Sequence, residues 1–263
     1  MSKRLKELFE RSRAEGRALF IPYVTAGYPR RTDTVPILLA MEAGGADVIE
    51  VGVPFTDPMA DGATIQHANQ VAIEQGVTLK DCFDFVAEAR KQGLKAPVLF
   101  MGYYNTVLAR GETRAAVEAS AAGADGFIIV DLPPEEASSF VAACRANDMS
   151  FIPLVAPTTS EDRIEKIAAV ADAFLYCVSV TGTTGKGNVV TAELPEFLAR
   201  VRRHTALPLA VGFGVSTRAH VEAIGGMADA AVIGSAIIAT IDAAEEDHRA
   251  QRVREFVEDV SGH

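Results

Sequence analysis

The sequence predicts a (β/α)8 TIM barrel with an extra N-terminal helix, formed as a single domain over residues 1–263. Eight short apolar segments alternate with helical patterns along the whole chain. Most of these segments are continuously apolar, as expected for parallel strands covered on both faces. The length of 263 residues also suits such a barrel, which typically has ~250. A doubly wound open sheet is the alternative, but the first turn, TAGYP, lacks a dinucleotide-binding glycine fingerprint.

The predicted elements follow one another in a regular order. Residues 5–16, LKELFERSRAEG, predict the extra helix before the first strand. The strands are predicted over 20–25, 47–51, 97–101, 126–130, 150–155, 173–178, 208–212 and 230–234. Several of the helical patterns begin with Thr, Ser or Pro and end near Gly, as helix capping requires. They cover 34–45, 78–93, 113–123, 134–148, 160–170, 192–204 and 217–226, and a further helical pattern over 63–75 follows Asp61 and Gly62.

An Ala-Asp pair precedes four of the predicted strands. It occurs in GADVIEV, GADGFII, VADAFLY and MADAAVI, which open the second, fourth, sixth and eighth strands. We interpret the pair as a turn that recurs on alternate strands at the N-terminal rim of the barrel. Chance recurrence in an alanine-rich chain is the alternative.

Composition excludes several classes of function. The net charge of −10 argues against a general nucleic-acid or anionic membrane surface, because both need basic patches. The cysteines Cys82, Cys144 and Cys177 are scattered, which predicts neither a disulfide framework nor a zinc site. The charged N-terminal segment has no apolar signal region, and no apolar run reaches the ~18 residues of a membrane span. We therefore expect a soluble cytoplasmic protein without a metal.

Three glycine-rich loops follow the last three predicted strands, at 179–188, 212–216 and 233–237. In this fold the active site lies at the C-terminal ends of the strands. Glycine lets the backbone approach an anion closely, and a helix beginning near Ser235 would direct N–H groups to the same point. Together the loops predict a phosphate site, with simple tight turns as the alternative.

A carboxylate lies at the end of the second predicted strand. Ile49 and Val51 are apolar, so alternation along the strand points Glu50 towards the barrel axis. Burial there would raise its pKa and suit a general acid or base. A structural ion pair is the alternative, although no cation is apparent on neighbouring strand ends. Asp57 and Asp61 lie on the next loop, where either could form a turn or cap a helix, and spacing does not distinguish them.

Other catalytic side chains have weaker support. No predicted strand has an internal or C-terminal lysine, which disfavours a Schiff-base aldolase and leaves acid–base catalysis for any carbon–carbon cleavage. A Ser/His/Asp triad is not indicated, because Ser235 lies in a glycine-rich context without a nucleophile elbow. The histidines lie in helical or terminal segments: His67, His204, His220, His248 and His263.

Sequence blocks along essentially the whole chain resemble the tryptophan synthase alpha subunit family, and they occur in the family's order. The most specific is EVGVPFTDPMADG, residues 50–62, followed by IQHAN. The others are IPYVTAGYP, YYN, DLPPEE, VSVTGTTG, VGFGVS and IGSAI. The resemblance implies retro-aldol cleavage of indole-3-glycerol phosphate to indole and glyceraldehyde 3-phosphate, with no metal or cofactor in this chain. It places the family's general acid–base glutamate on Glu50 and its essential aspartate, which holds the indole N–H, on Asp61.

The resemblance also implies a set of substrate-binding residues. The phosphate site carries over to Gly185, Gly214, Gly234 and Ser235, with Phe213 beside it. Thr184 matches a threonine that closes over the substrate and meets Asp61. Tyr176 matches a tyrosine that contacts substrate near Glu50, and Tyr23 and Met101 fall in the wall of the indole pocket.

The family's partner is a beta subunit that carries pyridoxal phosphate and receives the indole. The resemblance implies an alpha2beta2 heterotetramer with the C-terminal face of the barrel against the beta chain, and Asp57 on a loop that contacts it. Three alternatives remain: a stand-alone lyase that releases free indole, a related sugar-phosphate isomerase barrel, and a non-catalytic regulatory subunit. The intact Glu50 and Asp61 argue against the last, and isomerase barrels lack the PFTDPMADG loop.

Overall fold

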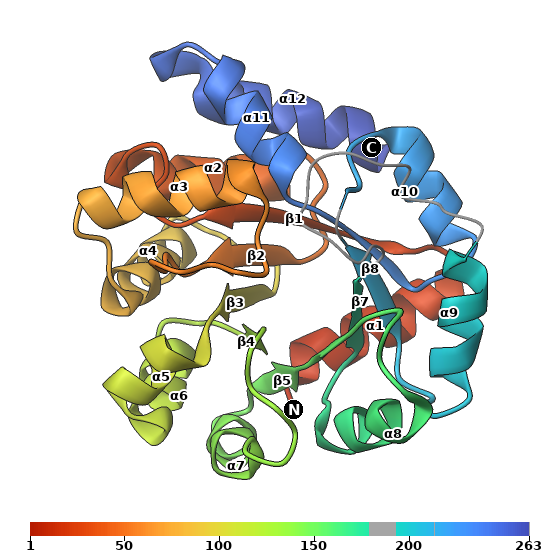
Figure 1. The fold of residues 1–263 in the computed structure, drawn as a ribbon. Coiled ribbons are helices and arrows are strands. Elements are labelled where there is room, and N and C mark those ends of the chain that lie inside the picture. The colour runs from red at the N-terminus through yellow and green to blue at the C-terminus, as the bar shows by residue number, and fades with distance from the viewer. Residues whose placement is uncertain (179–192, 213, 263) are drawn as a thin grey trace.

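The structure is a computed structural model that describes residues 1–178, 193–212 and 214–262 (Figure 1). Within these ranges nine parallel strands form one sheet, in the order β5-β4-β3-β2-β1-β9-β8-β7-β6. The strands are β1 Leu19–Thr25, β2 Ile49–Gly52, β3 Val98–Gly102, β4 Gly126–Ile129, β5 Ser150–Ile152, β6 Leu154–Val155, β7 Leu175–Val178, β8 Leu209–Gly212 and β9 Ala230–Ile233. The predicted (β/α)8 barrel is confirmed.

The sheet begins and ends on the two parts of one predicted strand. β5 pairs with β4 and β6 pairs with β7, and the two parts meet at Pro153. Proline has no N–H group to donate to a ladder, so the strand is interrupted there. The Tyr176 N–H still donates to the Pro153 carbonyl at 3.1 Å, which connects the break to β7. The segment predicted over 150–155 as one strand is therefore divided.

Helices surround the sheet (Figure 1). The predicted helix over 134–148 begins only at Ser138, because the chain first makes a turn in which the Glu136 N–H donates to the Pro133 carbonyl. Two helices, α5 and α12, were not predicted. The helices are α1 Lys3–Glu15, η1 Arg31–Asp33, α2 Thr34–Ala43, α3 Ala63–Glu74, α4 Leu79–Lys91, α5 Tyr104–Arg110, α6 Glu112–Ala121, α7 Ser138–Ala146, α8 Glu161–Val170, α9 Leu194–Arg202, α10 Arg218–Gly225, α11 Ser235–Ala243, η2 Glu246–His248 and α12 Arg249–Ser261. None of these described helices is long and apolar enough to cross a membrane.

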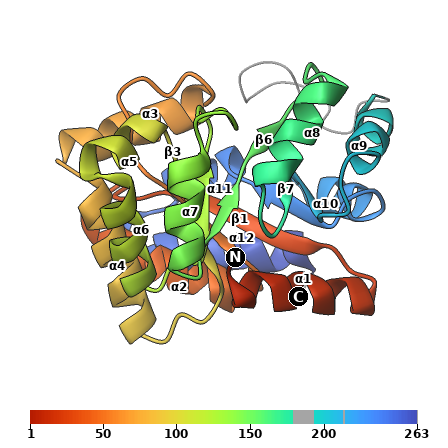
Figure 2. The same cartoon turned by 90° about the horizontal axis from the view of Figure 1, so that it is seen from below.

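Alternation along the strands creates two apolar cores. Outward-facing residues such as Ile49 and Val51 pack between the sheet and the helices. Inward-facing residues fill the barrel, and Leu5, Leu8 and Phe9 of α1 belong to this inner core. Figure 2 shows α1 along the lower edge of the barrel. The extra N-terminal helix is thus confirmed, and it closes the N-terminal end of the barrel, away from the strand ends expected to hold the site.

The recurring Ala-Asp turn has a structural role at the N-terminal rim. Each aspartate precedes one strand and accepts an N–H from the start of the strand before it in sequence. The four bonds run to Asp47 from Phe20 at 2.8 Å, to Asp125 from Val98 at 2.9 Å, to Asp172 from Phe151 at 3.3 Å and to Asp229 from Leu209 at 2.9 Å. The predicted turn is confirmed, and the same contact occurs four times around the N-terminal rim.

An arginine completes each of these rim sites. It comes from the segment before the strand whose N–H is bound, so one carboxylate ties together a helix end and two strands. The ion pairs are Arg17 with Asp47, Arg90 with Asp125, Arg145 with Asp172 and Arg202 with Asp229. Asp125 is the most buried of the four, and it also accepts hydrogen bonds from the Ser2 hydroxyl and from Arg4.

We expect Asp125→Ala to lower the free energy of unfolding by about 3 kcal/mol, because it leaves several buried donors without an acceptor. Urea unfolding followed by circular dichroism measures this loss. Asp84→Ala is the matched control, since Asp84 pairs with Lys80 on the surface and both side chains are 60% exposed. That control should change stability by less than about 1 kcal/mol. Equal losses in the two variants would contradict the rim interpretation.

Candidate active site

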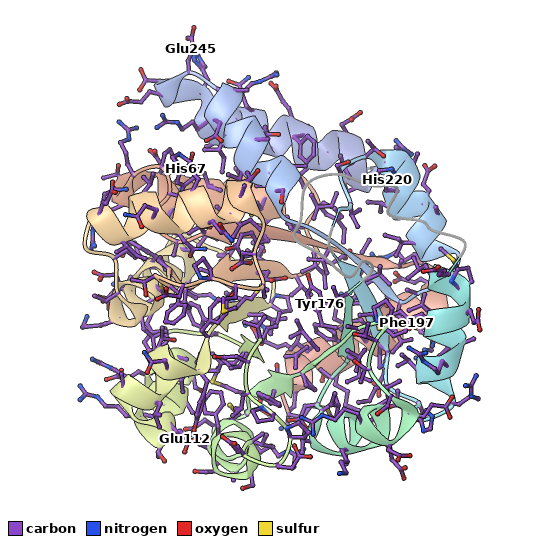
Figure 3. All side chains as sticks on the ribbon, viewed as in Figure 1. His67, Glu112, Tyr176, Phe197, His220 and Glu245 are labelled. Atoms are coloured by element: carbon purple, nitrogen blue, oxygen red, sulfur yellow. The ribbon has the colours of Figure 1, made fainter. Side chains whose placement is uncertain are left out.

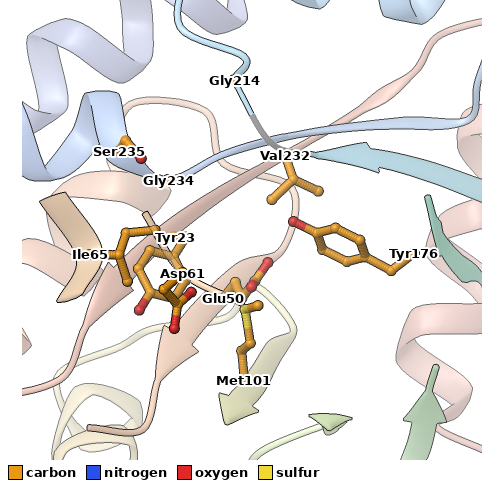
Figure 4. Close-up of a pocket in the computed structure, with 10 residues that line it drawn as sticks. All are labelled: Tyr23, Glu50, Asp61, Ile65, Met101, Tyr176, Gly214, Val232, Gly234 and Ser235. Carbon is orange, nitrogen blue, oxygen red and sulfur yellow. The ribbon is translucent and has the colours of Figure 1, made fainter. Parts of the chain in front are cut away.

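A pocket opens among the C-terminal ends of the strands (Figure 4). It contains every predicted site residue that the structure describes: Tyr23, Glu50, Asp61, Met101, Tyr176, Gly214, Gly234 and Ser235. Thr184, Gly185 and Phe213, also predicted, lie outside the described residues. Figure 3 places Tyr176 centrally, whereas His67 and His220 lie on outer helices. Sequence positions far apart in the chain therefore meet in one cavity.

Glu50 is held in this cavity by β2. Its neighbours Ile49 and Val51 belong to the outer core, so alternation turns its side chain into the barrel, as predicted. The side chain is 1% exposed, and its Oε2 has no hydrogen-bond partner among the described residues. Burial, with a further contribution from the nearby Asp61 carboxylate, raises the pKa of Glu50 to about 8. Glu50 therefore keeps its proton near neutral pH.

Asp61 faces the same cavity from the loop between β2 and α3. Burial raises the pKa of Asp61 to about 6, and a hydrogen bond that its Oδ2 accepts from the Tyr103 hydroxyl at 3.2 Å opposes this rise. Gly62 occupies the N-cap position of α3, so Asp61 is not a helix cap. Asp57 is exposed and accepts a hydrogen bond from the Thr56 hydroxyl. The tertiary structure thus distinguishes two aspartates that spacing alone could not.

The environments of Glu50 and Asp61 give the two carboxyl groups different pKa values. Near pH 7, Glu50 holds a proton that it can donate, and Asp61 has lost the proton that would block it as an acceptor. A pair of titratable groups with pKa values moved apart is the usual arrangement for an acid and a charge-stabilising group. Among the described residues, no lysine lines the pocket and no cluster of His, Cys, Asp and Glu could hold a metal ion.

The loop that carries Asp61 is fastened to the barrel at two points. Asn69 of α3 accepts the Phe55 N–H through its side-chain oxygen at 3.3 Å. The Tyr103 ring stacks on the Phe55 ring with centroids 4.7 Å apart, and the Tyr103 hydroxyl accepts the Ala60 N–H at 2.9 Å. These contacts hold the loop over the mouth of the barrel.

Two tyrosines form opposite walls of the cavity, and each depends on a glycine of the neighbouring strand. An added Cβ at Gly52 would overlap the Tyr23 hydroxyl, and one at Gly212 would overlap the Tyr176 hydroxyl. The Tyr23 hydroxyl lies 3.0 Å from the Thr25 hydroxyl. Burial and the negative charges of both site carboxylates raise the pKa of each tyrosine, so both remain neutral phenols.

The other end of the pocket is formed by the beginning of α11. Ser235 is its first residue, as predicted, and Gly234 is the N-cap, with no side chain to bond the first-turn N–H groups. The Gly234 carbonyl accepts the Ile237 N–H at 2.9 Å. Gly214 has a φ of 81°, which favours glycine and brings its backbone to the same cavity. Backbone N–H groups and the positive end of a helix suit an anion such as phosphate.

Sequence reasoning missed three residues of the site. Val232 lines the pocket from β9, and the alternation that placed Glu50 inside the barrel could have placed it too. Ile65 lines the pocket from the first turn of α3, but an apolar residue in a helical pattern carries no signal of that role. Tyr103 was part of a matching block, yet only the folded structure shows its contact with Asp61.

Comparisons with known proteins agree with this geometry. A family model described as "Tryptophan synthase alpha chain" matches residues 9–262. The chain is 48% identical to the tryptophan synthase alpha chain of Roseiflexus sp. RS-1 over 98% of its own length and 99% of the relative's. It is 47% identical to the Saccharomyces cerevisiae tryptophan synthase over 99% of this chain, which spans only 37% of that longer protein.

Solved structures show the same fold along the whole chain. A Mycobacterium tuberculosis tryptophan synthase structure matches with a TM-score of 0.91 and 32% identity, covering 100% of this chain and 98% of that one. The tryptophan synthase subunit alpha of Legionella pneumophila matches with a TM-score of 0.90 at 32% identity and the same coverage. On the family match, the identities and the shared fold, this chain belongs to the tryptophan synthase alpha chain family.

Proposed function

We propose that this chain cleaves indole-3-glycerol phosphate to indole and glyceraldehyde 3-phosphate, with Glu50 and Asp61 as its catalytic residues. It does so in the cytoplasm and as a single barrel domain over residues 1–263. The observation that carries the proposal is the pair of buried carboxyl groups with separated pKa values, set opposite the N-terminus of α11. The alpha chain family to which the chain belongs supports the same lyase reaction.

The cleavage needs one proton to be added to C3 of the indole ring and one to be removed from a side-chain hydroxyl. Glu50 donates its proton to C3 of the indole ring, which makes a cationic indolenine. The ionised Asp61 accepts a hydrogen bond from the ring N–H and stabilises the positive charge. The Glu50 carboxylate then takes the proton of the hydroxyl on the adjacent side-chain carbon. The carbon–carbon bond breaks, its electron pair returns to the ring, and indole and the aldehyde result.

Binding residues hold the substrate at both ends. The backbone of Gly185, Gly214 and Gly234 and the start of α11 at Ser235 bind the phosphate group. Tyr23, Met101 and Tyr176 enclose the indole ring and exclude water, which strengthens the electrostatic interaction between Asp61 and the ring. The family resemblance assigns Phe213 to the phosphate site and Thr184 to closure over the substrate, and both residues lie outside the described ranges.

The indole passes to a beta subunit bound on the C-terminal face of the barrel, in an alpha2beta2 heterotetramer whose pyridoxal phosphate belongs to the partner. Two large apolar side chains at this face support the docking. Met59, on the loop after β2, is 86% exposed, and Leu108, on the short helix after β3, is 55% exposed. Single exposed apolar residues are common on protein surfaces, so these two residues specify the proposed contact and do not by themselves establish a partner. Asp57 lies on the same loop as Met59. Membership of the alpha chain family favours a partner-bound enzyme over a stand-alone lyase.

We expect Glu50→Gln and Asp61→Asn each to lower the rate of indole release by at least about 10³-fold, because each removes a group needed in the transition state. Binding of glycerol 3-phosphate, measured by calorimetry, should stay within about threefold of wild type, since the phosphate site lies at the other end of the pocket. Loss of ligand binding together with activity would show that these residues support the fold instead.

The raised pKa of Glu50 predicts that Glu50→Gln stabilises the protein increasingly between pH 5 and pH 8. The folded state binds this proton more tightly than the unfolded state, whose glutamate has the ordinary pKa of 4.5. The wild type therefore loses stability as pH rises from 4.5 through about 8, whereas a glutamine is unaffected. The difference in unfolding free energy should grow to a few kcal/mol at most, at about 1.4 kcal/mol per pKa unit.

Urea unfolding of both proteins at pH 5, 6.5 and 8 measures this difference. Glu10→Gln is the control, because Glu10 is exposed on α1 and pairs only with Lys6 at the surface among the described residues. A stability gain in Glu50→Gln that is independent of pH would mean that Glu50 is not a buried acid in solution.

We expect Leu108→Glu to weaken binding to a beta subunit by at least about tenfold, because it places a charge in an apolar contact. Val117→Glu is the matched control: Val117 is 47% exposed on α6, which follows α5 on the outside of the barrel. Titration calorimetry with the beta subunit measures both affinities. Equal losses, or none in Leu108→Glu, would place the partner on another surface.

A further inference from the structure

We propose that Tyr103 is a positioning residue for the cleavage, which holds Asp61 facing the substrate through its phenol hydroxyl. This inference rests on the catalytic role proposed for Asp61. It follows from the position of Tyr103 between β3 and α5, in contact with the loop that carries Asp61.

The hydroxyl of Tyr103 makes two hydrogen bonds to adjacent residues of that loop. It accepts the Ala60 N–H at 2.9 Å and donates to Asp61 Oδ2 at 3.2 Å. One phenol therefore orients the backbone and the side chain of the same short segment. The bond to Oδ2 fixes the orientation of the carboxylate, whose oxygens keep further lone pairs for the substrate N–H.

The Tyr103 side chain is itself held firmly. Its ring stacks on Phe55, and the side chain is almost completely buried. Its carbonyl accepts the N–H of Thr106 at 3.1 Å and the Thr106 hydroxyl at 2.7 Å, which fixes the backbone at the start of α5. Because the Tyr103 backbone is fixed between β3 and α5, its hydroxyl can hold Ala60 and Asp61 of the loop in place.

The other hydrogen bonds near Asp61 come from the loop itself and from Gln66 of α3, whose side-chain Nε2 donates to the Asp61 carbonyl at 2.8 Å. The Asp61 N–H donates to the Pro58 carbonyl, and the Met59 N–H donates to the Asp57 carbonyl. Asn69 holds the loop at Phe55, six residues before Asp61. Among the described hydrogen bonds, those of Tyr103 are the ones that reach Ala60 and Asp61 from outside the loop and α3.

The same hydrogen bond acts on the charge of Asp61. Burial raises the pKa of this carboxyl group, and the donated hydrogen bond from Tyr103 lowers it. The other titratable side chains that face this space are Glu50 from β2, Tyr23 from β1 and Tyr176 from β7. Loss of the Tyr103 hydroxyl should therefore raise the pH at which Asp61 gains its proton and stops accepting the ring N–H.

The test compares Tyr103→Phe with Tyr104→Phe in the full-length chain. The first change removes both hydrogen bonds and keeps the ring that stacks on Phe55. The second removes a phenol hydroxyl from the next residue, whose hydrogen bond goes to Glu112 at 2.8 Å between α5 and α6. Indole release from indole-3-glycerol phosphate is measured from pH 5 to pH 9 for both variants and for Asp61→Asn.

For Tyr103→Phe, we expect the acidic fall in kcat/KM to move to higher pH by about half a unit to one unit. The substrate phosphate also titrates near pH 6, but it is the same in every assay and cannot produce a shift between proteins. At pH 7, kcat should fall about tenfold or more with KM within about threefold, because placement of a catalytic group is lost while phosphate binding is kept. Tyr104→Phe should match the wild type.

A local readout separates positioning from general damage. Hydrogen exchange of the Ala60 amide should accelerate in Tyr103→Phe and stay unchanged in Tyr104→Phe, because only the first loses its acceptor. If Asp61→Asn is inactive but Tyr103→Phe keeps the wild-type pH profile, the positioning role is wrong and the proposed function stands. Equal losses in both tyrosine variants would also overturn it. If Asp61→Asn cleaves normally, the catalytic role of Asp61 fails, and this inference fails with it.

Discussion

A protonated glutamate buried at the mouth of the barrel is the constraint on which the site depends. Glu50 has almost no exposed surface, and its Oε2 has no hydrogen-bond partner among the described residues. An unpaired buried carboxyl group avoids the cost of a buried charge by keeping its proton. Burial thus costs stability and prepares an acid at the same time. The strand, the tyrosine walls and the loop that brings Asp61 close all serve to hold this group away from water.

At the N-terminal end of the barrel, paired polar groups stabilise the fold. At the N-terminal rim, four aspartates each join an arginine to the N–H of a strand, and α1 seals the inner core. The four rim aspartates are paired, whereas at the C-terminal end the Glu50 Oε2 has no hydrogen-bond partner among the described residues. This division follows the general rule for such barrels, in which stability and catalysis occupy different faces. The rim can remain rigid while the loops above it vary.

Within the pocket, precision comes from contacts between elements. Gly52 and Gly212 leave room for Tyr23 and Tyr176, and the loop after β2 is fastened by Phe55 and Asn69. Tyr103 ties the same loop to α5 beside Asp61. Each contact joins segments that are distant in sequence, so the position of a reacting group depends on several strands at once. Catalytic groups need this support because small displacements strongly reduce the rate.

The sequence by itself determined the barrel, the closing helix and the inward direction of Glu50, because apolar runs and strand alternation are local patterns. The glycine-rich segment at 233–237 also predicted the helix start near Ser235. Only the tertiary structure separated Asp61 from Asp57, divided the fifth strand at Pro153 and showed the Tyr103 contact. Those features arise from burial and hydrogen bonds between elements far apart in the chain, and no local pattern encodes which distant side chains will meet.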